Sequence, residues 1–135
     1  DKVILAGLEA TLRLYLQPEK LTETLPTLHL LTKSMDVLKE KAEQLKACLA
    51  NHLKDYQVEI EESFAQIGSG SQPMATIPSI AVTIAEKTEA KLTALLAIFK
   101  ALEQPIIGRV EKGKIWLDLR SVADFKALLD TVEKL

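Results

Sequence analysis

The sequence predicts an α+β fold: a four-stranded, mostly antiparallel sheet with helices on one face. The run from Ile106 to Arg120 alternates in polarity around Lys112-Gly113, which is typical of a β-hairpin. Residues 56–61 and 79–85 alternate in the same way and predict two more strands. Segments with apolar residues three and four positions apart precede, separate and follow these strands and predict helices. With 135 residues, we expect a single domain, residues 1–135.

Helices are expected before the first strand. Apolar residues at helical spacing predict a helix over residues 2–17, which Pro18 ends. Residues 22–26 interrupt the pattern, and a cluster of leucines follows around a short turn. The clearest amphipathic helix spans about residues 33–54. Its apolar side carries Met35, Leu38, Ala42, Leu45, Leu49 and Leu53.

The remaining elements follow in order. Residues 67–73 are expected to form a loop, and Pro78 is expected to mark the start of the second strand. A helix is predicted over residues 88–103, with Thr88 as its N-cap. After the hairpin, Ser121 is expected to cap a final helix that runs to Leu135.

The hairpin register follows from its two-residue turn. It places Glu111 opposite Lys114, Val110 opposite Ile115, Arg109 opposite Trp116, and Ile107 opposite Asp118. One face then carries Ile106, Gly108, Val110, Ile115, Leu117 and Leu119, an apolar set that helices should cover. The other face is mixed and carries Ile107, Arg109, Glu111, Lys114, Trp116, Asp118 and Arg120.

Composition excludes several classes of protein. The formal net charge is −2, which lacks the basic footprint of a protein that binds nucleic acid by charge alone. The single Cys48 cannot form an internal disulfide, which fits a reducing compartment. No apolar run is long enough for a membrane span, and no signal-peptide layout is present. The chain lacks an initiator Met, so we expect a segment of a longer protein.

Few residues form patterns typical of catalysis. Cys48 and His52 are four apart on one helix, but no second ligand pair accompanies them, so no metal site is expected. Glu61 and Glu62 point to opposite faces of a strand and cannot act on one substrate together.

The loop Gly68-Ser69-Gly70 is neither a nucleophile elbow nor a phosphate loop. Its two remaining interpretations are a flexible connection and a loop at the rim of an active site.

The mixed hairpin face is the best candidate for a site. Arg109 can stack on Trp116 across the strands, and Asp118 lies diagonally where it can orient Arg109. An arginine held in this way can bind a carboxylate or a phosphate. The alternative is that this face, with Arg109, Trp116, Asp118 and Arg120, packs against a neighbouring domain.

Several segments together resemble one enzyme family. They are Asp1-Lys2, residues 8–16, Pro18-Glu19, residues 25–28, residues 30–32, residues 66–71 with Pro73, Ile77-Pro78-Ser79, residues 105–110 and residues 113–120. In this order they resemble the small C-terminal domain of bacterial selenocysteine synthase, the L-seryl-tRNA(Sec) selenium transferase family.

The resemblance implies the small domain of a fold-type I enzyme that depends on pyridoxal phosphate. It implies that the parent enzyme converts seryl-tRNA(Sec) to selenocysteinyl-tRNA(Sec) with selenophosphate, in the cytoplasm and as a homo-oligomer. It further implies that the large cofactor domain of the same chain is a partner, toward which the Arg109 face packs.

The family's cofactor-binding lysine follows Ser-Gly-Asp. Here Lys2 follows Asp1 without the preceding Ser-Gly. We therefore expect no catalytic residue and no bound cofactor in this segment itself.

Two other functions stay open at this point. The chain resembles equally the small domain of related pyridoxal-phosphate enzymes that act on a small amino acid or an amino-sugar acid. It is also compatible with a free-standing module that binds a small ligand.

Overall fold

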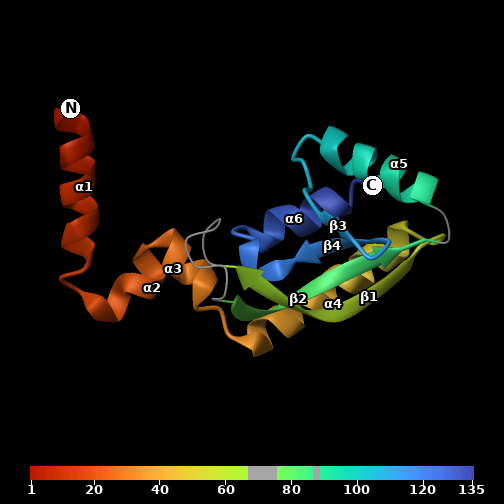
Figure 1. Ribbon diagram of the computed structural model, residues 1–135, viewed down its shortest axis with the longest axis horizontal. Coiled ribbons are helices and arrows are strands. Elements are labelled where there is room, and N and C mark those ends of the chain that lie inside the picture. The colour runs from red at the N-terminus through yellow and green to blue at the C-terminus, as the bar shows by residue number, and fades with distance from the viewer. Residues whose placement is uncertain (67–75, 87–88) are drawn as a thin grey trace. The chain divides into compact units, whose positions relative to one another are not determined.

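The computed structural model describes residues 1–66, 76–86 and 89–135 (Figure 1). Its contacts divide the chain into two compact units, Asp1–Lys33 and Ser34–Leu135. The expectation of a single domain over residues 1–135 stays a prediction.

The first unit is entirely helical in its regular structure. It contains α1 (Lys2–Leu14), the 3-10 turn η1 (Pro18–Lys20), α2 (Leu21–Thr24) and α3 (Pro26–Leu31). The carboxylate of Asp1 caps α1 by accepting from the backbone N–H of Val3 at 3.1 Å. The predicted first helix was three residues too long, and the predicted interruption at residues 22–26 instead holds most of α2.

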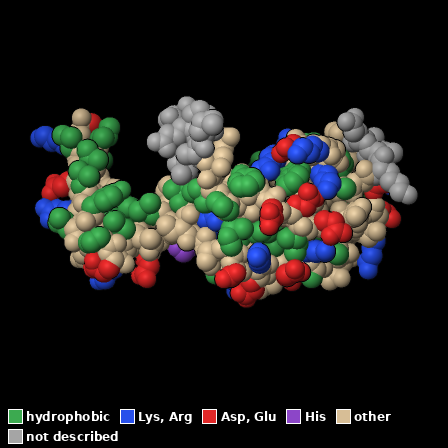
Figure 2. Space-filling view, turned by 60° about the horizontal axis from the view of Figure 1, so that its bottom comes forward, with side chains coloured by type: hydrophobic (Ala, Val, Ile, Leu, Met, Phe, Trp, Pro, Cys, Tyr) green, Lys and Arg blue, Asp and Glu red, His purple; other side chains and the backbone are tan. Residues whose placement is uncertain are grey.

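Helix α1 buries none of its residues. Its large apolar side chains are exposed, among them Ile4, Leu8 and Leu12, and Figure 2 shows exposed apolar side chains on this helix. On the face of the second unit visible in Figure 2, acidic and basic side chains are interspersed.

The second unit confirms the predicted α+β fold. It contains α4 (Met35–His52), β1 (Gln57–Gln66), β2 (Thr76–Ala85), α5 (Glu89–Ala101), β3 (Arg109–Glu111), β4 (Lys114–Asp118), the 3-10 turn η2 (Leu119–Ser121) and α6 (Phe125–Val132). The strands form one antiparallel sheet in the order β1-β2-β4-β3.

Helices cover one face of this sheet. Helix α4 packs against β1 and β2, α6 packs against α4, and α5 contacts β4 (Figure 1). The shared core includes Leu38, Leu45, Leu49, Val82, Ile84, Phe99, Ile115, Leu119 and Val132, each fully buried. Because the described helices lie on this side, the opposite sheet face is free to carry polar side chains. We call it the open face, made of Glu59, Glu61, Ser63, Ser79, Ala81, Thr83, Arg109, Glu111, Lys114, Trp116 and Asp118.

The first two strands are longer than predicted. They pair from Gln57↔Ala85 to Gln66↔Thr76, so Pro78 lies inside β2 rather than at its start. Strand β4 pairs with β2 only over Ala81–Ala85, so Pro78 has a single neighbouring strand. A proline, which cannot donate a backbone hydrogen bond, is tolerated at such a position.

The hairpin register is confirmed for its inner three pairs. Glu111↔Lys114, Val110↔Ile115 and Arg109↔Trp116 are all paired. The outer pair of Ile107 with Asp118 was wrong, because β3 begins only at Arg109. The side chain of Val110 was predicted to be covered and is 56% exposed, since β3 is the edge strand.

The C-terminal helix differs from the prediction at its start. Residues Leu119 and Arg120 leave the strand to form η2, and α6 begins at Phe125. The cap of α6 is Asp124, whose carboxylate accepts from the Ala127 N–H at 2.9 Å. The hydroxyl of Ser121 instead donates to the Asp118 carbonyl. Thr88, the expected cap of the preceding helix, lies outside the described residues.

None of the described helices is both long and apolar enough to cross a membrane.

Candidate functional site

The open face owes its layout to the sheet register. Ser63 pairs with Ser79, Ala81 with Asp118, and Thr83 with Trp116. The small residues of central strand β2 are buried and form a floor. Longer side chains from the flanking strands lie over that floor, which brings residues from β1, β3 and β4 into contact.

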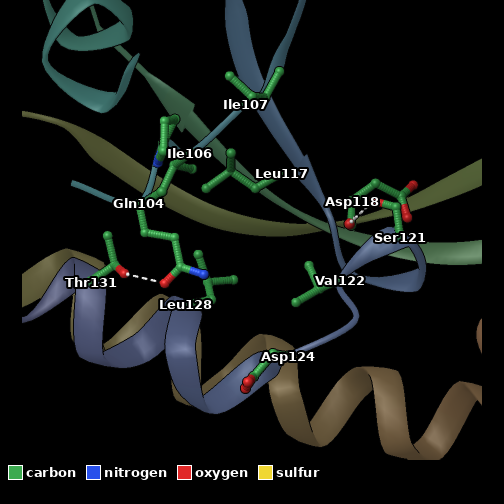
Figure 3. A pocket seen from close by; sticks show the side chains of 11 residues that line it. Gln104, Ile106, Ile107, Leu117, Asp118, Ser121, Val122, Asp124, Leu128 and Thr131 are labelled. Carbon is green, nitrogen blue, oxygen red and sulfur yellow. Dashed lines mark hydrogen bonds between the residues drawn. The ribbon is translucent and has the colours of Figure 1, made fainter. Parts of the chain in front are cut away.

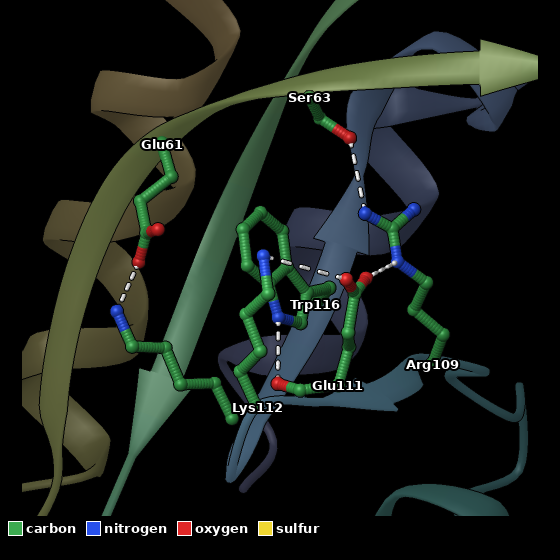
Figure 4. A network of polar contacts seen from close by, with 7 residues as sticks. Glu61, Ser63, Arg109, Glu111, Lys112 and Trp116 are labelled. Atoms are coloured by element: carbon green, nitrogen blue, oxygen red, sulfur yellow. Dashed lines mark hydrogen bonds and ion pairs between the residues drawn. The ribbon is translucent and has the colours of Figure 1, made fainter.

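Arg109 and Trp116 form the contact that the sequence predicted. The Arg109 guanidinium carbon lies 5.0 Å from the centre of the Trp116 ring. The indole Nε1 donates to the Glu111 carbonyl at 3.0 Å, and the indole is 8% exposed. Arg109 Nε donates to the Glu111 carboxylate at 3.2 Å (Figure 4). The guanidinium therefore rests on a fixed ring beside a carboxylate.

The carboxylate of Asp118 accepts three hydrogen bonds. It receives the hydroxyl of Ser63 at 2.8 Å, the hydroxyl of Ser79 at 2.6 Å and the backbone N–H of Arg120 at 3.0 Å. Asp118 was expected to orient Arg109 directly. Instead, Ser63 lies between them and accepts from Arg109 Nη2 at 3.2 Å (Figure 4).

A second polar cluster lies at the other end of the open face. The ammonium of Lys114 and the hydroxyl of Thr83 both donate to the same carboxylate oxygen of Glu61. These two hydrogen bonds, that of Lys114 first, hold the pKa of Glu61 below its usual value. Lys114 was placed opposite Glu111 by the register, but its ion pair is with Glu61.

Arg120 departs from the rest of the predicted site. It lies on η2, and its side chain is almost fully buried. Its Nη2 and Nε donate to the Pro78 carbonyl at 2.6 and 3.1 Å, and Nη2 lies 3.8 Å from the sulfur of Met35. These contacts join η2 to β2 and to the start of α4.

The open face is hollowed beside Arg109. The hollow has a volume of about 730 Å³. Its lining includes Ser63, Phe64, Arg109, Glu111, Trp116 and Asp118. Phe64 is 61% exposed at its border. The hollow offers hydrogen-bond donors and an aromatic surface for a ligand or a second protein surface.

A smaller cavity of about 250 Å³ lies between α6 and the segment before β3 (Figure 3). Its walls are largely apolar, with Ile106, Leu117 and Leu128 among them. Its polar groups are used locally: Asp124 caps α6 and the Thr131 hydroxyl donates to the Ala127 carbonyl. The residues that line this cavity therefore do not indicate a specific ligand.

Other candidate chemistry finds little support. Among the described residues no group of three or more His, Cys, Asp or Glu side chains is arranged to hold a metal ion. Burial, followed by the nearby charge of Glu133, raises the pKa of the Cys48 thiol, which disfavours the reactive thiolate. The loop residues Gly68, Ser69 and Gly70 lie outside the described residues, so their role at a rim stays a prediction.

Sequence reasoning missed Ser63 and Ser79. Both are buried serines on neighbouring strands whose hydroxyls meet on one carboxylate. The signal that identifies them is the pairing register, because nothing in the local sequence of either strand points to Asp118.

Comparison with known proteins adds the family. The family model described as L-seryl-tRNA selenium transferase, SelA, matches residues 1–123. The chain belongs to the SelA family.

Curated relatives agree over the whole chain. The chain is 67% identical to an L-seryl-tRNA(Sec) selenium transferase of Haemophilus influenzae and 66% identical to that of Pasteurella multocida, in both cases over 100% of this chain and 30% of the relative. It is 68% identical to the protein of the same name from Mannheimia succiniciproducens, over 29% of that protein. The SelA segment described here thus spans about 30% of the length of these curated relatives.

Proposed function

We propose that this chain is the C-terminal domain of an L-seryl-tRNA(Sec) selenium transferase, which converts seryl-tRNA(Sec) to selenocysteinyl-tRNA(Sec) with selenophosphate. The observation that carries this proposal is 67% identity along the entire chain to a relative of that name. At such identity the core and the open face are expected to be preserved together. We further propose that the parent enzyme is a cytoplasmic homo-oligomer.

The parent enzyme is proposed to use pyridoxal phosphate, but the described residues do not fit a site for it. A cofactor lysine has to lie in an enclosed pocket with its amine available. Lys112 borders the hollow with its side chain 79% exposed. Lys114 is held by Glu61 and Lys46 by Glu59. We therefore propose that the cofactor is held by a part of the parent enzyme outside this segment.

The role proposed for the open face is to pack toward the large domain, with Arg109 reaching the active-site side. Two features support it: Trp116 and Arg109 form an ordered pair, and the adjoining hollow is large.

The test uses the full-length protein that contains this segment. The purified protein is incubated with seryl-tRNA(Sec), selenophosphate and pyridoxal phosphate, and selenocysteinyl-tRNA(Sec) is quantified after deacylation. We expect product with the full-length protein and none when residues 34–135 are deleted. Absence of product from a folded full-length protein contradicts the proposal.

Parallel reactions separate this function from the alternatives. Turnover of a free amino acid or an amino-sugar acid without tRNA would assign the chain to a small-molecule relative instead. If residues 1–135 alone bind a small ligand, and if deleting residues 34–135 leaves the enzyme's activity unchanged, the chain would instead be a free-standing module.

A further inference from the structure

A continuous line of hydrogen bonds joins a cation to an anion on the open face. Arg109 Nη2 donates to the Ser63 hydroxyl oxygen at 3.2 Å, and the Ser63 hydroxyl donates to Asp118 at 2.8 Å. We propose that Ser63 and Asp118 are positioning residues that set the direction of the Arg109 guanidinium in the hollow. This inference rests on the proposed function of the open face, adds Ser63 to it, and makes the effect of Asp118 on Arg109 indirect.

The direction of each hydrogen bond follows from chemistry. A serine hydroxyl has one proton to donate, and an ionised carboxylate only accepts. The Ser63 proton is therefore committed to Asp118, which leaves the lone pairs of the Ser63 oxygen to face Arg109. In this arrangement the Ser63 hydroxyl links the Asp118 carboxylate to the Arg109 guanidinium, and the two charged groups make no direct contact.

Asp118 is itself held firmly. Besides Ser63 it accepts from the Ser79 hydroxyl at 2.6 Å and from the Arg120 N–H at 3.0 Å. Ser63 and Ser79 are 4% and 1% exposed, so water does not compete well for these bonds. The position of the Asp118 carboxylate is therefore fixed. Through Ser63 it restrains the Arg109 side chain, which is 44% exposed.

The guanidinium then has three restraints from three directions. Ser63 holds Nη2, Glu111 holds Nε, and the Trp116 ring supports the plane. Within the described part of the chain, Nη1 has no hydrogen-bond partner and remains available to an acceptor in the hollow.

The orientation of the Arg109 guanidinium matters for binding an anion because Arg109 and Glu111 together carry no net charge. A neutral pair does not attract an anion from a distance, so recognition depends on a correctly aimed donor. The geometry suits an oxygen acceptor, such as a carboxylate, a phosphate or a carbonyl oxygen, presented by the substrate or by the large domain.

The two serines supply a matched experiment in the full-length enzyme. Ser63→Ala and Ser79→Ala each remove one buried hydroxyl that donates to Asp118. Of these two described serines, Ser63 is the one that also contacts Arg109. We expect Ser63→Ala to lower kcat/KM for selenocysteinyl-tRNA(Sec) formation by about threefold to tenfold, the loss of one directed hydrogen bond. Ser79→Ala, which leaves Asp118 held by Ser63 and by the Arg120 N–H, should cause a smaller loss, and Ser63→Thr, which keeps a hydroxyl, should retain most of the activity.

A double-mutant cycle shows whether Ser63 acts through Arg109. In an Arg109→Ala background, adding Ser63→Ala should cause no further loss. Equal losses from Ser63→Ala and Ser79→Ala, or an undiminished effect of Ser63→Ala in that background, would overturn the proposal.

The same variants separate this proposal from the proposed function. If the wild-type enzyme makes no selenocysteinyl-tRNA(Sec), the proposed function fails, and the Ser63–Arg109 cycle is then measured on the urea midpoint of unfolding. A coupled shift in that midpoint supports the fixed arginine, and independent shifts overturn it.

Discussion

Two arginines of the hairpin region differ sharply in their surroundings. Arg120 is 4% exposed and donates two hydrogen bonds to the Pro78 carbonyl, whereas the side chain of Arg109 is 44% exposed in a hollow. Both were assigned to one site from sequence. The difference in burial identifies Arg120 as a structural residue and leaves Arg109 as the candidate functional residue.

The difference predicts opposite behaviour on substitution. Arg120→Ala should lower the free energy of unfolding by about 2–4 kcal/mol, because it removes two hydrogen bonds to the Pro78 carbonyl and the packing of an almost fully buried side chain. Arg109→Ala should lower it by less than about 1 kcal/mol, as expected of an exposed ion pair. Urea denaturation of both variants measures these values, and equal losses would contradict the distinction.

The pair of Glu61 and Lys114 makes stability depend on pH. The folded protein lowers the pKa of Glu61 through its hydrogen bonds to Lys114 and then Thr83. A carboxyl group with a lowered folded pKa stabilises the fold above its unfolded pKa, and this contribution is lost as the pH falls through the folded value.

Glu61→Gln therefore has a pH-dependent effect. At about pH 7 the variant should unfold more easily than wild type, and the difference should shrink as the pH falls to about 3, where Glu61 is increasingly protonated. Denaturation curves at several pH values test this. A difference that stays constant across this range would assign the loss to packing alone.

At the scale of elements, the hairpin depends on two glycines for different reasons. The turn residues Lys112 and Gly113 have φ angles of 52° and 70°, the left-handed values of a two-residue hairpin turn. Gly108 lies where the chain approaches β4 closely. A Cβ there would come within 2.7 Å of Ile115 Cγ2 and 3.1 Å of the Trp116 carbonyl oxygen.

Gly108→Ala should consequently destabilise the protein by about 1–3 kcal/mol through overpacking. Gly113→Asn is the matched control, because a Cβ there meets nothing within 4 Å and asparagine tolerates a positive φ. Thermal unfolding of both variants checks this. If Gly108→Ala unfolds like wild type, the close approach of residue 108 to β4 is wrong.

Sequence pattern and structure agree best where a repeat is regular. The apolar spacing of Leu38, Leu45 and Leu49 identified α4, and the two-residue turn identified the inner hairpin register. Element ends were less predictable because they depend on competing local bonds. Ser121 was the predicted cap of the last helix, but Asp124 lies three residues before Ala127 and accepts its N–H, so the helix begins later.

The candidate site was only partly predictable for a related reason. Arg109 and Trp116 lie across one hairpin, so a local register fixes their contact. Ser63 and Asp118 are far apart in sequence and meet through the β1-β2-β4 order, which no local pattern specifies. The ion pair of Lys114 with Glu61 joins β4 to β1 and was not predicted for the same reason.

At the scale of the whole molecule, residues 34–135 contain all the buried apolar side chains that form the described core. The open face lies on the opposite side of the same sheet. The described residues of this unit thus combine a buried core with a polar, hollowed sheet face, the face proposed to pack toward the large domain.

The most direct test of this account is the turnover of Arg109→Ala in the full-length enzyme at saturating seryl-tRNA(Sec) and selenophosphate. Lys46→Ala, which breaks an exposed ion pair with Glu59, is the control. We expect turnover to fall by about tenfold or more for Arg109→Ala, with a nearly unchanged free energy of unfolding, and to stay near wild type for the control. Unchanged turnover of Arg109→Ala would contradict the role of the open face in the reaction.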